Sequence, residues 1–326
     1  MIDERVGSAE LEELADVLIP PCVLGAYTLE GLISKTSTAL VYIARGGAFG
    51  AGEGVLKLTG EEYAPLLERE LGLLNRCQAA EIAGIVRPLR AELEWIKPQS
   101  IPNASAAALL LPFLSGGDLV QWIGEHATRT GRLGAHLGLQ IGEQVGGVLR
   151  ELLRLPKPVV HRDVKPQNVL FPYPGAPLAE LTLIDLDASE ELDIALDDFS
   201  GAPPEIAKRL VEDVNGFGEL LFILATGREP PTDMSPDPQT GNPDYDSLVV
   251  KCLISEPEPD VGYVCLADNL LWQDLEKALA TERARPKREG LHGPLPHLLD
   301  RRVLAAIGGL LFIALIAAVA AKAFIG

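Results

Sequence analysis

Residues 161–168 read HRDVKPQN and gather several side chains that can do chemistry in one short stretch. Asp163 can accept a proton, and Lys165, two positions on, can offset negative charge. Asn168 and a later aspartate, Asp185, carry the oxygen atoms that Mg²⁺ prefers as ligands. Asp185 ends an apolar run further along the chain. These residue types suit the transfer of a negatively charged group.

The stretch matches the pattern H-R-D-x-K-P-x-N, and the chain resembles the eukaryotic-type serine/threonine protein kinases found in bacteria over about residues 27–280. The resemblance implies ATP and Mg²⁺ as cofactors and a protein serine or threonine as substrate. It implies that Asp163 takes the hydroxyl proton, that Lys165 points at the γ-phosphate, and that Asn168 and Asp185 hold Mg²⁺. Lys165 also favours a protein substrate, because small-molecule kinases of related fold usually lack a lysine here. A chance loop of these residue types is the alternative.

Upstream, Lys57 ends the segment VLK at 55–57, which resembles the family's Val-Ala-Ile-Lys strand. Glu70 follows inside an expected helix at 61–76. The resemblance implies that Lys57 holds the α- and β-phosphates of ATP and that Glu70 fixes the lysine, so both count as catalytic. A solvated ion pair is the alternative for such a lysine and glutamate taken alone. Their order and spacing favour the catalytic pair.

Residues 109–119 (LLLPFLSGGDL) resemble the hinge that joins the two lobes of a kinase. The resemblance implies that backbone groups near Pro112, Phe113 and Leu114 meet the adenine edge. It also implies that Asp118 hydrogen-bonds the ribose. An acidic helix cap is the alternative for Asp118.

The phosphate-binding loop departs most from the family pattern. Ser34, Thr36 and Ala39 occupy the three positions where G-x-G-x-x-G has glycine. Their side chains hinder close approach of the backbone to phosphate, so we expect weaker ATP binding than is usual for the family. The glycines at 46–54 are expected in the turn between the second and third strands. A second departure is DLD at 185–187, where the family has Asp-Phe-Gly. A pseudokinase that binds nucleotide or acts as a scaffold is therefore an alternative function, and a small-molecule kinase is another.

The segment from 185 to 205 is short and acidic, and it ends in PPE, which resembles the family's Ala-Pro-Glu. A solvated acidic loop is one interpretation. The other is that one of its carboxylates pairs with Arg162, in place of the phosphate that orders this segment in related kinases. Further on, the resemblance implies that Asp213 supports the backbone of the catalytic loop.

The elements that position these residues can be predicted from periodicity. Alternating apolar residues and turn signals predict strands at 27–33, 39–45, 54–58, 85–96 and 106–114, with the one helix at 61–76 among them. The chain is mostly helical beyond Gly117. We therefore expect an α+β, bilobal, protein-kinase-like fold with a small β-rich N-lobe and a larger helical C-lobe. The expected parts are an N-terminal helical extension at 1–22, the N-lobe at 23–112, the C-lobe at 113–280, a basic juxtamembrane linker at 281–302, a transmembrane helix at 303–321 and a short tail at 322–326.

Composition excludes several classes of protein. The chain has 326 residues and a net charge of −18, from 28 basic and 46 acidic side chains. This charge argues against nucleic acid as a partner, because phosphate binding needs a basic face. A hydrophobic content of 47% excludes a wholly disordered chain. The four cysteines form no C-x-x-C pair, which predicts free thiols rather than disulfides or a zinc site.

Residues 303–321 contain no charged side chain, and a helix of this length spans about 28 Å, close to the thickness of a bilayer core. A buried core helix is the alternative. Arg301 and Arg302 stand just before the segment, and positive flanks stay cytoplasmic. The sequence therefore predicts a membrane-tethered serine/threonine protein kinase that crosses the cell membrane once and has a cytoplasmic catalytic part. Ala305 and Gly309 form a small-xxx-small pair, a weak indication of self-association.

Overall fold

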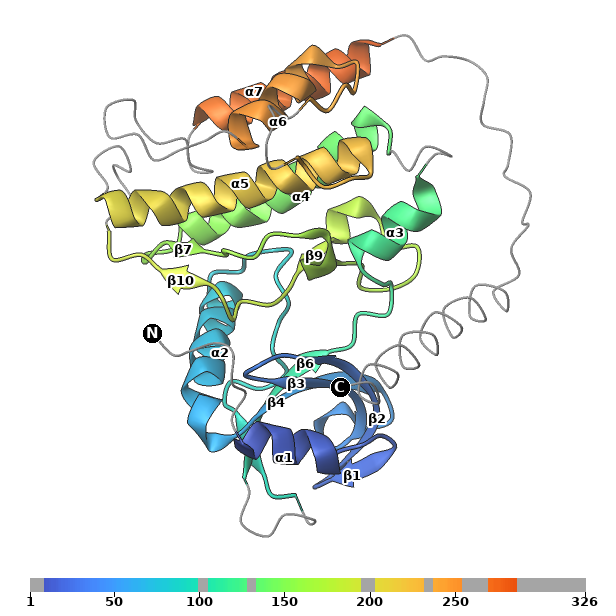
Figure 1. Ribbon diagram of the computed structural model, residues 1–326, viewed down its shortest axis with the longest axis vertical. Coiled ribbons are helices and arrows are strands. Elements are labelled where there is room, and N and C mark those ends of the chain that lie inside the picture. The colour runs from blue at the N-terminus through green and yellow to red at the C-terminus, as the bar shows by residue number, and fades with distance from the viewer. Residues whose placement is uncertain are drawn as a thin grey trace, which may run out of the picture. The chain divides into compact units, whose positions relative to one another are not determined.

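A computed structural model describes residues 9–98, 105–127, 133–194, 203–231, 237–253 and 269–285. The fold is α+β: a β-sheet fills the N-terminal part and helices make up the C-terminal part (Figure 1). The predicted division into a β-rich first part and a helical second part is confirmed, while the domain boundaries stay predictions. Within the ranges above, no helix is long and apolar enough to cross a membrane. The predicted span at 303–321 lies outside them.

Six antiparallel strands form one sheet in the order β1-β2-β3-β4-β6-β5. Their bounds are β1 Cys22–Leu24, β2 Tyr27–Lys35, β3 Leu40–Gly46, β4 Glu53–Thr59, β5 Glu94–Ile96 and β6 Ala106–Pro112. The first three strands predicted above correspond to β2, β3 and β4. As expected, the glycine-rich run forms most of the turn between β3 and β4. Gly46, Gly47 and Gly50 take positive φ angles of 83°, 50° and 60° there, which glycine adopts without strain.

The strand predicted at 85–96 is wrong except at its end, where β5 forms. The first residues of this segment pair with the helical part of the chain instead of the sheet. Val86 N donates to Leu183 O at 3.1 Å, and Leu183 N donates to Gly84 O at 2.7 Å. Pro88 follows and has no N–H to give to a strand ladder.

Strict alternation along the sheet decides which face Lys57 occupies. One face forms a core from Leu56 and Leu58 of β4 with Ala106, Ala108 and Leu110 of β6. Helix α1 (Ala9–Val17) covers this face, and its Leu11 and Leu14 are 0% exposed. Because successive side chains of a strand point to opposite faces, Lys57 points away from α1.

Helix α2 (Ala64–Ala79) packs against the face of the sheet that carries Lys57. Leu67, Leu71 and Leu74 recur at helical spacing and pack in one core with Ala107 and Leu109 of β6. Glu70 lies among these buried positions and is itself 2% exposed. The fold therefore directs an acidic side chain of α2 toward the face that carries Lys57.

The helical part carries the remaining candidate residues. Its helices are α3 Leu119–His126, α4 Ala135–Leu153, α5 Pro204–Thr226, α6 Pro243–Leu253 and α7 Asn269–Ala284. Two short antiparallel pairs join β7 (Val159–Val160) to β10 (Glu190–Glu191) and β8 (Val169–Leu170) to β9 (Thr182–Leu183). Helices α4 and α5 approach closely, since a Cβ placed on Gly142 would lie 2.6 Å from Leu221 Cδ2. Helices α6 and α7 lie beyond them, on the side away from the sheet (Figure 1).

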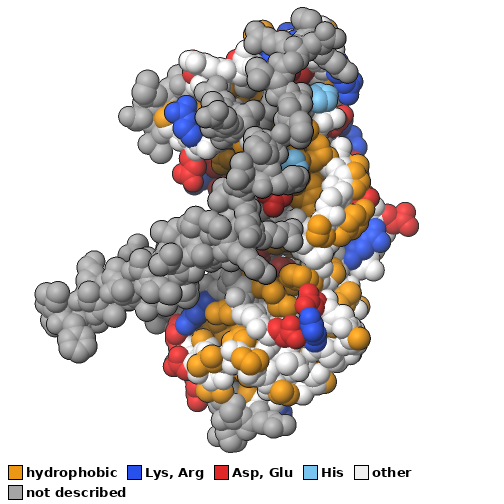
Figure 2. Space-filling view, turned by 90° about the vertical axis from the view of Figure 1, so that its right-hand side faces the viewer, with side chains coloured by type: hydrophobic (Ala, Val, Ile, Leu, Met, Phe, Trp, Pro, Cys, Tyr) orange, Lys and Arg blue, Asp and Glu red, His pale blue; other side chains and the backbone are white. Residues whose placement is uncertain are grey.

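Side chains on the surface show mixed charge. On the face in Figure 2, Lys and Arg side chains are interspersed with Asp and Glu over the described part. Cys22, Cys77 and Cys252 are free thiols, as predicted, and Cys265 lies outside the residues that the structure describes.

Candidate active site

Lys57 sits among three carboxylates. Its Nζ lies 2.9 Å from Glu70 Oε2, 2.7 Å from Asp185 Oδ1 and 3.6 Å from Asp187 Oδ2. Lys57 is 7% exposed and Glu70 is 2% exposed, so these two form a buried ion pair and not a solvated one, while Asp185 and Asp187 are partly exposed. Burial alone lowers the pKa of Lys57, but the negative charges of Glu70, Asp185 and Asp187 outweigh it and raise that pKa above its ordinary 10.5. The lysine is therefore held fully charged in one position.

The catalytic loop fixes Asp163 from two sides. Asp163 Oδ2 accepts hydrogen bonds from Lys165 Nζ at 2.6 Å and from Asn168 Nδ2 at 2.8 Å. Asn168 Nδ2 also donates to Asp163 O at 2.9 Å. A cation and an amide therefore hold the Asp163 carboxylate in one orientation.

A buried aspartate holds the backbone of this loop. The carboxylate of Asp213 on α5 accepts hydrogen bonds from His161 N at 2.8 Å and Arg162 N at 2.7 Å. Arg162 has a φ of 66°, which costs strain for a residue with a side chain, and these bonds help to stabilise it. Burial raises the pKa of Asp213, and the two N–H bonds oppose that shift. The contact predicted between Asp213 and the loop backbone is confirmed.

The short pair β8–β9 brings Asn168 and Asp185 to the same place. Val169 pairs with Leu183, and Ile184 N donates to Asn168 O at 2.9 Å, so the next residue, Asp185, lies beside the catalytic loop. Asp185 has a φ of 69°. The backbone of Asn168 is thus bonded to the residue before Asp185, and the Asp185 carboxylate pairs with Lys57.

This donor set fits Mg²⁺. Three carboxylates, those of Glu70, Asp185 and Asp187, surround the single cation of Lys57. Mg²⁺ binds hard oxygen ligands and commonly takes only one or two carboxylates, with phosphates and water completing its shell. In the described ranges, no cluster of three or more His, Cys, Asp or Glu side chains is arranged to hold a metal. Asn168 and Asp185 would hold the ion together with phosphate oxygens.

The glycine-free loop is a tight turn between β2 and β3. Thr36 Oγ1 accepts hydrogen bonds from Thr38 N at 3.3 Å and from Ala39 N at 3.0 Å, so this hydroxyl stabilises the turn itself. Ala39 is 4% exposed and contributes to packing. Ser34 pairs with Val41, and Val41 pairs with Lys57, so Ser34 stands two strands from the lysine. Of the three positions, Ser34 is the exposed hydroxyl in register with Lys57.

Apolar side chains on the same sheet face were missed from the sequence. Val41, Val55 and Leu111 are partly exposed, and the sheet register pairs Val41 with Lys57 and Val55 with Leu111. Val55 lies two residues from Lys57 on β4, Val41 lies directly beside Lys57 on β3, and Leu111 lies two residues from Leu109, the partner of Lys57 on β6. This alternation is the signal that could have identified them. They form an apolar surface next to the lysine that suits a flat aromatic base.

The hinge residues follow directly after β6. Pro112 pairs with Gly54 of β4, and Pro112, Phe113 and Leu114 are all partly exposed. Asp118 is the N-cap residue of helix α3, where its Oδ1 accepts a hydrogen bond from Gln121 N at 2.8 Å. The helix-cap alternative for Asp118 is therefore present in the structure, and its contact with a ribose stays a prediction.

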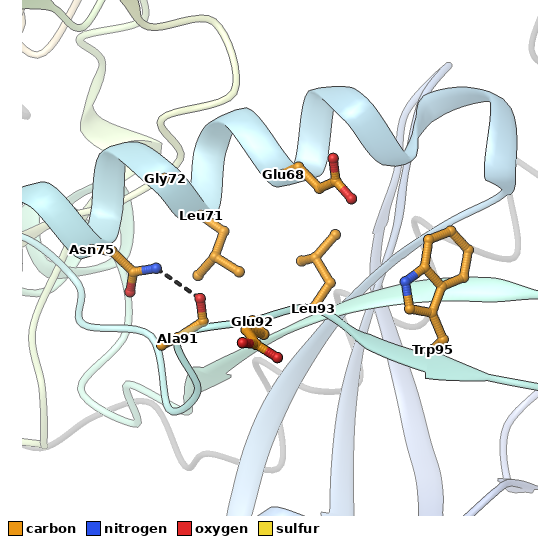
Figure 3. A pocket seen from close by; sticks show the side chains of 8 residues that line it. All are labelled: Glu68, Leu71, Gly72, Asn75, Ala91, Glu92, Leu93 and Trp95. Atoms are coloured by element: carbon orange, nitrogen blue, oxygen red, sulfur yellow. Dashed lines mark hydrogen bonds between the residues drawn. The ribbon is translucent and has the colours of Figure 1, made fainter.

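A cavity of about 380 Å³ lies outside this site, on the outer side of α2. Glu68, Leu71 and Asn75 of α2 line it opposite Leu93 and Trp95, and Asn75 Nδ2 donates to Ala91 O at 2.9 Å (Figure 3). Glu70 projects from the other, buried side of the same helix. None of the residues predicted to bind ATP, Mg²⁺ or substrate lines this cavity.

Comparisons with known proteins agree with this geometry. No family model matches the chain. It is 25% identical over 223 residues to the serine/threonine-protein kinase ATG1a of Arabidopsis thaliana, covering 64% of this chain and 32% of that protein. It is 28% identical over 228 residues to the serine/threonine-protein kinase PkaA of Streptomyces coelicolor, covering 63% and 39%.

A third relative, CBL-interacting protein kinase 29 of Oryza sativa subsp. japonica, is 25% identical over 225 residues, covering 65% of this chain and 48% of that protein. The chain thus spans less than half the length of these curated relatives. The expected relationship to eukaryotic-type serine/threonine protein kinases is confirmed.

Proposed function

We propose that this chain is a serine/threonine protein kinase that transfers the γ-phosphoryl group of ATP to a protein hydroxyl. The observation that carries the proposal is the arrangement around Asp163 and Lys57. The carboxylate of Asp163 is held by Lys165 and Asn168, and the buried Lys57 of β4 is held by Glu70 of α2 and by Asp185, which follows β9.

In this mechanism Asp163 orients the substrate hydroxyl and accepts its proton as the oxygen attacks the γ-phosphorus. Lys165 offsets negative charge on the transferred group, and Lys57 holds the α- and β-phosphates. Mg²⁺ held by Asn168 and Asp185 neutralises phosphate charge when bound. The bond from oxygen to phosphorus forms as the bond to ADP breaks, so the proton taken by Asp163 balances the step.

Two features support a protein substrate. Lys165 stands at the position where small-molecule kinases of related fold usually lack a lysine, and the relatives are named as protein kinases.

A pseudokinase is the second candidate, favoured by the loop between β2 and β3. The Thr36 hydroxyl is engaged in its own turn, and the three loop positions lack glycine. Intact Lys57, Glu70, Asp163, Asn168 and Asp185 favour the active enzyme.

The proposal includes a membrane tether. The uncharged segment 303–321 is long enough to span a bilayer, and Arg301 and Arg302 favour a cytoplasmic position for the part before it. The kinase would then act on proteins at the inner surface of the cell membrane.

The test is phosphotransfer by Asp163→Asn. Full-length protein in detergent is incubated with labelled ATP, Mg²⁺ and a mixed protein substrate, and phosphoserine and phosphothreonine are measured. We expect a loss of about a hundredfold or more, because the proton acceptor is removed while Lys57 and its carboxylates remain. Nucleotide binding should survive.

The matched control is Asp274→Asn, which removes a carboxylate on α7 that is 42% exposed and pairs with Lys251. It should leave the rate unchanged. Equal rates for the wild type and Asp163→Asn would contradict the proposed mechanism.

A further inference from the structure

Two consecutive glutamates follow Asp185 on the short strand β10. Glu190 pairs with Val160 and Glu191 with Val159, and this β7 pair stands immediately before the catalytic loop. Ser189 Oγ also donates to His161 O at 3.2 Å. Because neighbouring side chains of a strand point to opposite faces, Glu190 and Glu191 reach different parts of the molecule.

Glu190 reaches the catalytic loop and α5. Its carboxylate lies 3.4 Å from Arg162 Nη1 and also pairs with Arg209 of α5. Arg162 is further fixed by Glu212 Oε2, which is 2.8 Å from its Nε. The residue next to Arg162 is Asp163, so Glu190 connects the segment after Asp185 to the loop that carries the proton acceptor.

Glu191 reaches α2 from the other face of β10. It pairs with Arg76, and Lys157 Nζ lies 4.0 Å from its Oε2. Arg76 Nη2 also donates to Lys157 O at 2.9 Å, and Arg69 Nη2 donates to Asp187 O at 2.6 Å. Arg69 and Arg76 share one face of α2, the helix that carries Glu70.

We propose that Glu190 and Glu191 are positioning residues that set the geometry of the catalytic groups without a phosphate on this segment. Glu190 holds the loop of Asp163, and Glu191 holds the helix of Glu70. Together they carry a charge of about −2 at neutral pH, close to the charge of about −1.5 to −2 that one phosphate group brings. This inference rests on the proposed kinase function.

The exposure of these pairs indicates that they affect geometry more than stability. The side chains of Glu190 and Glu191 are 29% and 38% exposed. Their partners Arg162, Arg209 and Arg76 are exposed to a similar extent. Partly exposed ion pairs of this kind contribute about 0–1 kcal/mol each to stability. Single substitutions should therefore leave the protein folded while loosening the catalytic loop or α2.

The first measurement is steady-state phosphotransfer by full-length protein in detergent, after phosphatase treatment and with an intact mass that shows no phosphate. We expect the dephosphorylated wild type to stay active. Glu190→Gln should lower kcat on the order of tenfold with little change in KM for ATP, because it acts through Asp163. Glu191→Gln should mainly raise KM for ATP, because it acts through α2 and Lys57. Glu190→Asp, which keeps the charge, should recover much of the loss.

The matched control is Glu151→Gln. Glu151 pairs with Arg154 at 2.8 Å and is 50% exposed, but this pair lies at the end of α4. Its kinetics should equal those of the wild type. Unchanged kcat and KM in both glutamine variants, or loss of activity on dephosphorylation, would overturn the inference.

A second measurement separates this inference from the proposed function. Amide hydrogen exchange at residues 159–163 reports on the β7–β10 pairing whether or not the protein transfers phosphate. Exchange should be faster in Glu190→Gln than in the wild type and Glu151→Gln. A wild type without phosphotransfer but with this exchange pattern would contradict the kinase proposal and support the positioning role of Glu190. Unchanged exchange in Glu190→Gln would contradict that positioning role.

Discussion

At the scale of single residues, three carboxylates surround the ammonium group of Lys57. Its ammonium group faces the buried carboxylate of Glu70. Burial raises the pKa of Glu70 above its ordinary value, although the charge of Lys57 opposes that shift. The same ammonium also faces Asp185 and Asp187. Removing the cation therefore leaves three carboxylates close together, one of them buried without a counter-charge.

We predict that Lys57→Met weakens binding of ATP–Mg²⁺ by at least tenfold and also destabilises the fold by about 3–5 kcal/mol, the usual cost of breaking a buried ion pair. Calorimetric titration measures the first effect and urea unfolding the second. The double variant Lys57→Met/Glu70→Gln should recover part of the stability, because the buried charge is gone, but none of the nucleotide affinity. Unchanged ATP binding in Lys57→Met would mean that the nucleotide site lies elsewhere.

At the scale of elements, the β2–β3 turn replaces glycines with a hydroxyl that ties the turn together. The Thr36 hydroxyl accepts two backbone N–H groups, so it offers rigidity where glycine would offer freedom. Placing glycine at 34, 36 and 39 together removes both of these hydrogen bonds and leaves a gap at the buried Ala39. The triple substitution consequently costs stability even if the backbone then approaches phosphate more closely.

We therefore predict that Thr36→Val, which keeps shape and loses the hydroxyl, speeds amide exchange at Thr38 and Ala39. Each lost hydrogen bond is worth about 1 kcal/mol net, so ATP affinity should fall by less than in Lys57→Met. Thr38→Val is the matched control. The hydrogen bond described for the Thr38 hydroxyl is the one with the Thr36 hydroxyl, at 3.4 Å. Equal exchange in both variants would show that the Thr36 hydroxyl does not hold the turn.

Elements with strong periodicity could be predicted from the sequence, and pairings between distant residues could not. Alternation located β2, β3 and β4, and the resemblance to protein kinases implied the contact between Lys57 and Glu70. The start of the strand predicted at 85–96 failed because Val86 bonds to Leu183, a partner nearly a hundred residues away that no local pattern indicates. A carboxylate partner for Arg162 was one of two interpretations, but charge alone could not single out Glu190 among many acidic residues.

At the scale of the molecule, α2 joins the sheet to the helical part. One hydrophobic core contains Leu71 and Leu74 of α2, Leu109 of β6, Leu149 of α4 and Leu220 of α5. The core on the opposite face of the sheet, under α1, is separate from it. A shift of α2 therefore affects Glu70, the packing of the helical part and the Glu191 contact together, because all three are attached to one rigid helix.

The predicted membrane segment is a property of the whole chain and rests on the sequence alone. Residues 303–321 are uncharged and would span about 28 Å as a helix, so we predict that the full chain stays in the membrane fraction after carbonate and high-salt washing. A chain that ends at Asp300 should be released into the soluble fraction.

The paired substitution Leu310→Arg/Ile313→Arg should also release the protein, because each arginine near the centre of a span costs about 2.5–3.5 kcal/mol of insertion free energy. Leu310→Ile/Ile313→Leu, with the same composition as the wild type, should stay in the membrane. Recovery of the wild type in the soluble fraction without detergent would refute the tether and leave the kinase proposal standing, because the residues from Lys57 to Asp213 do not depend on it.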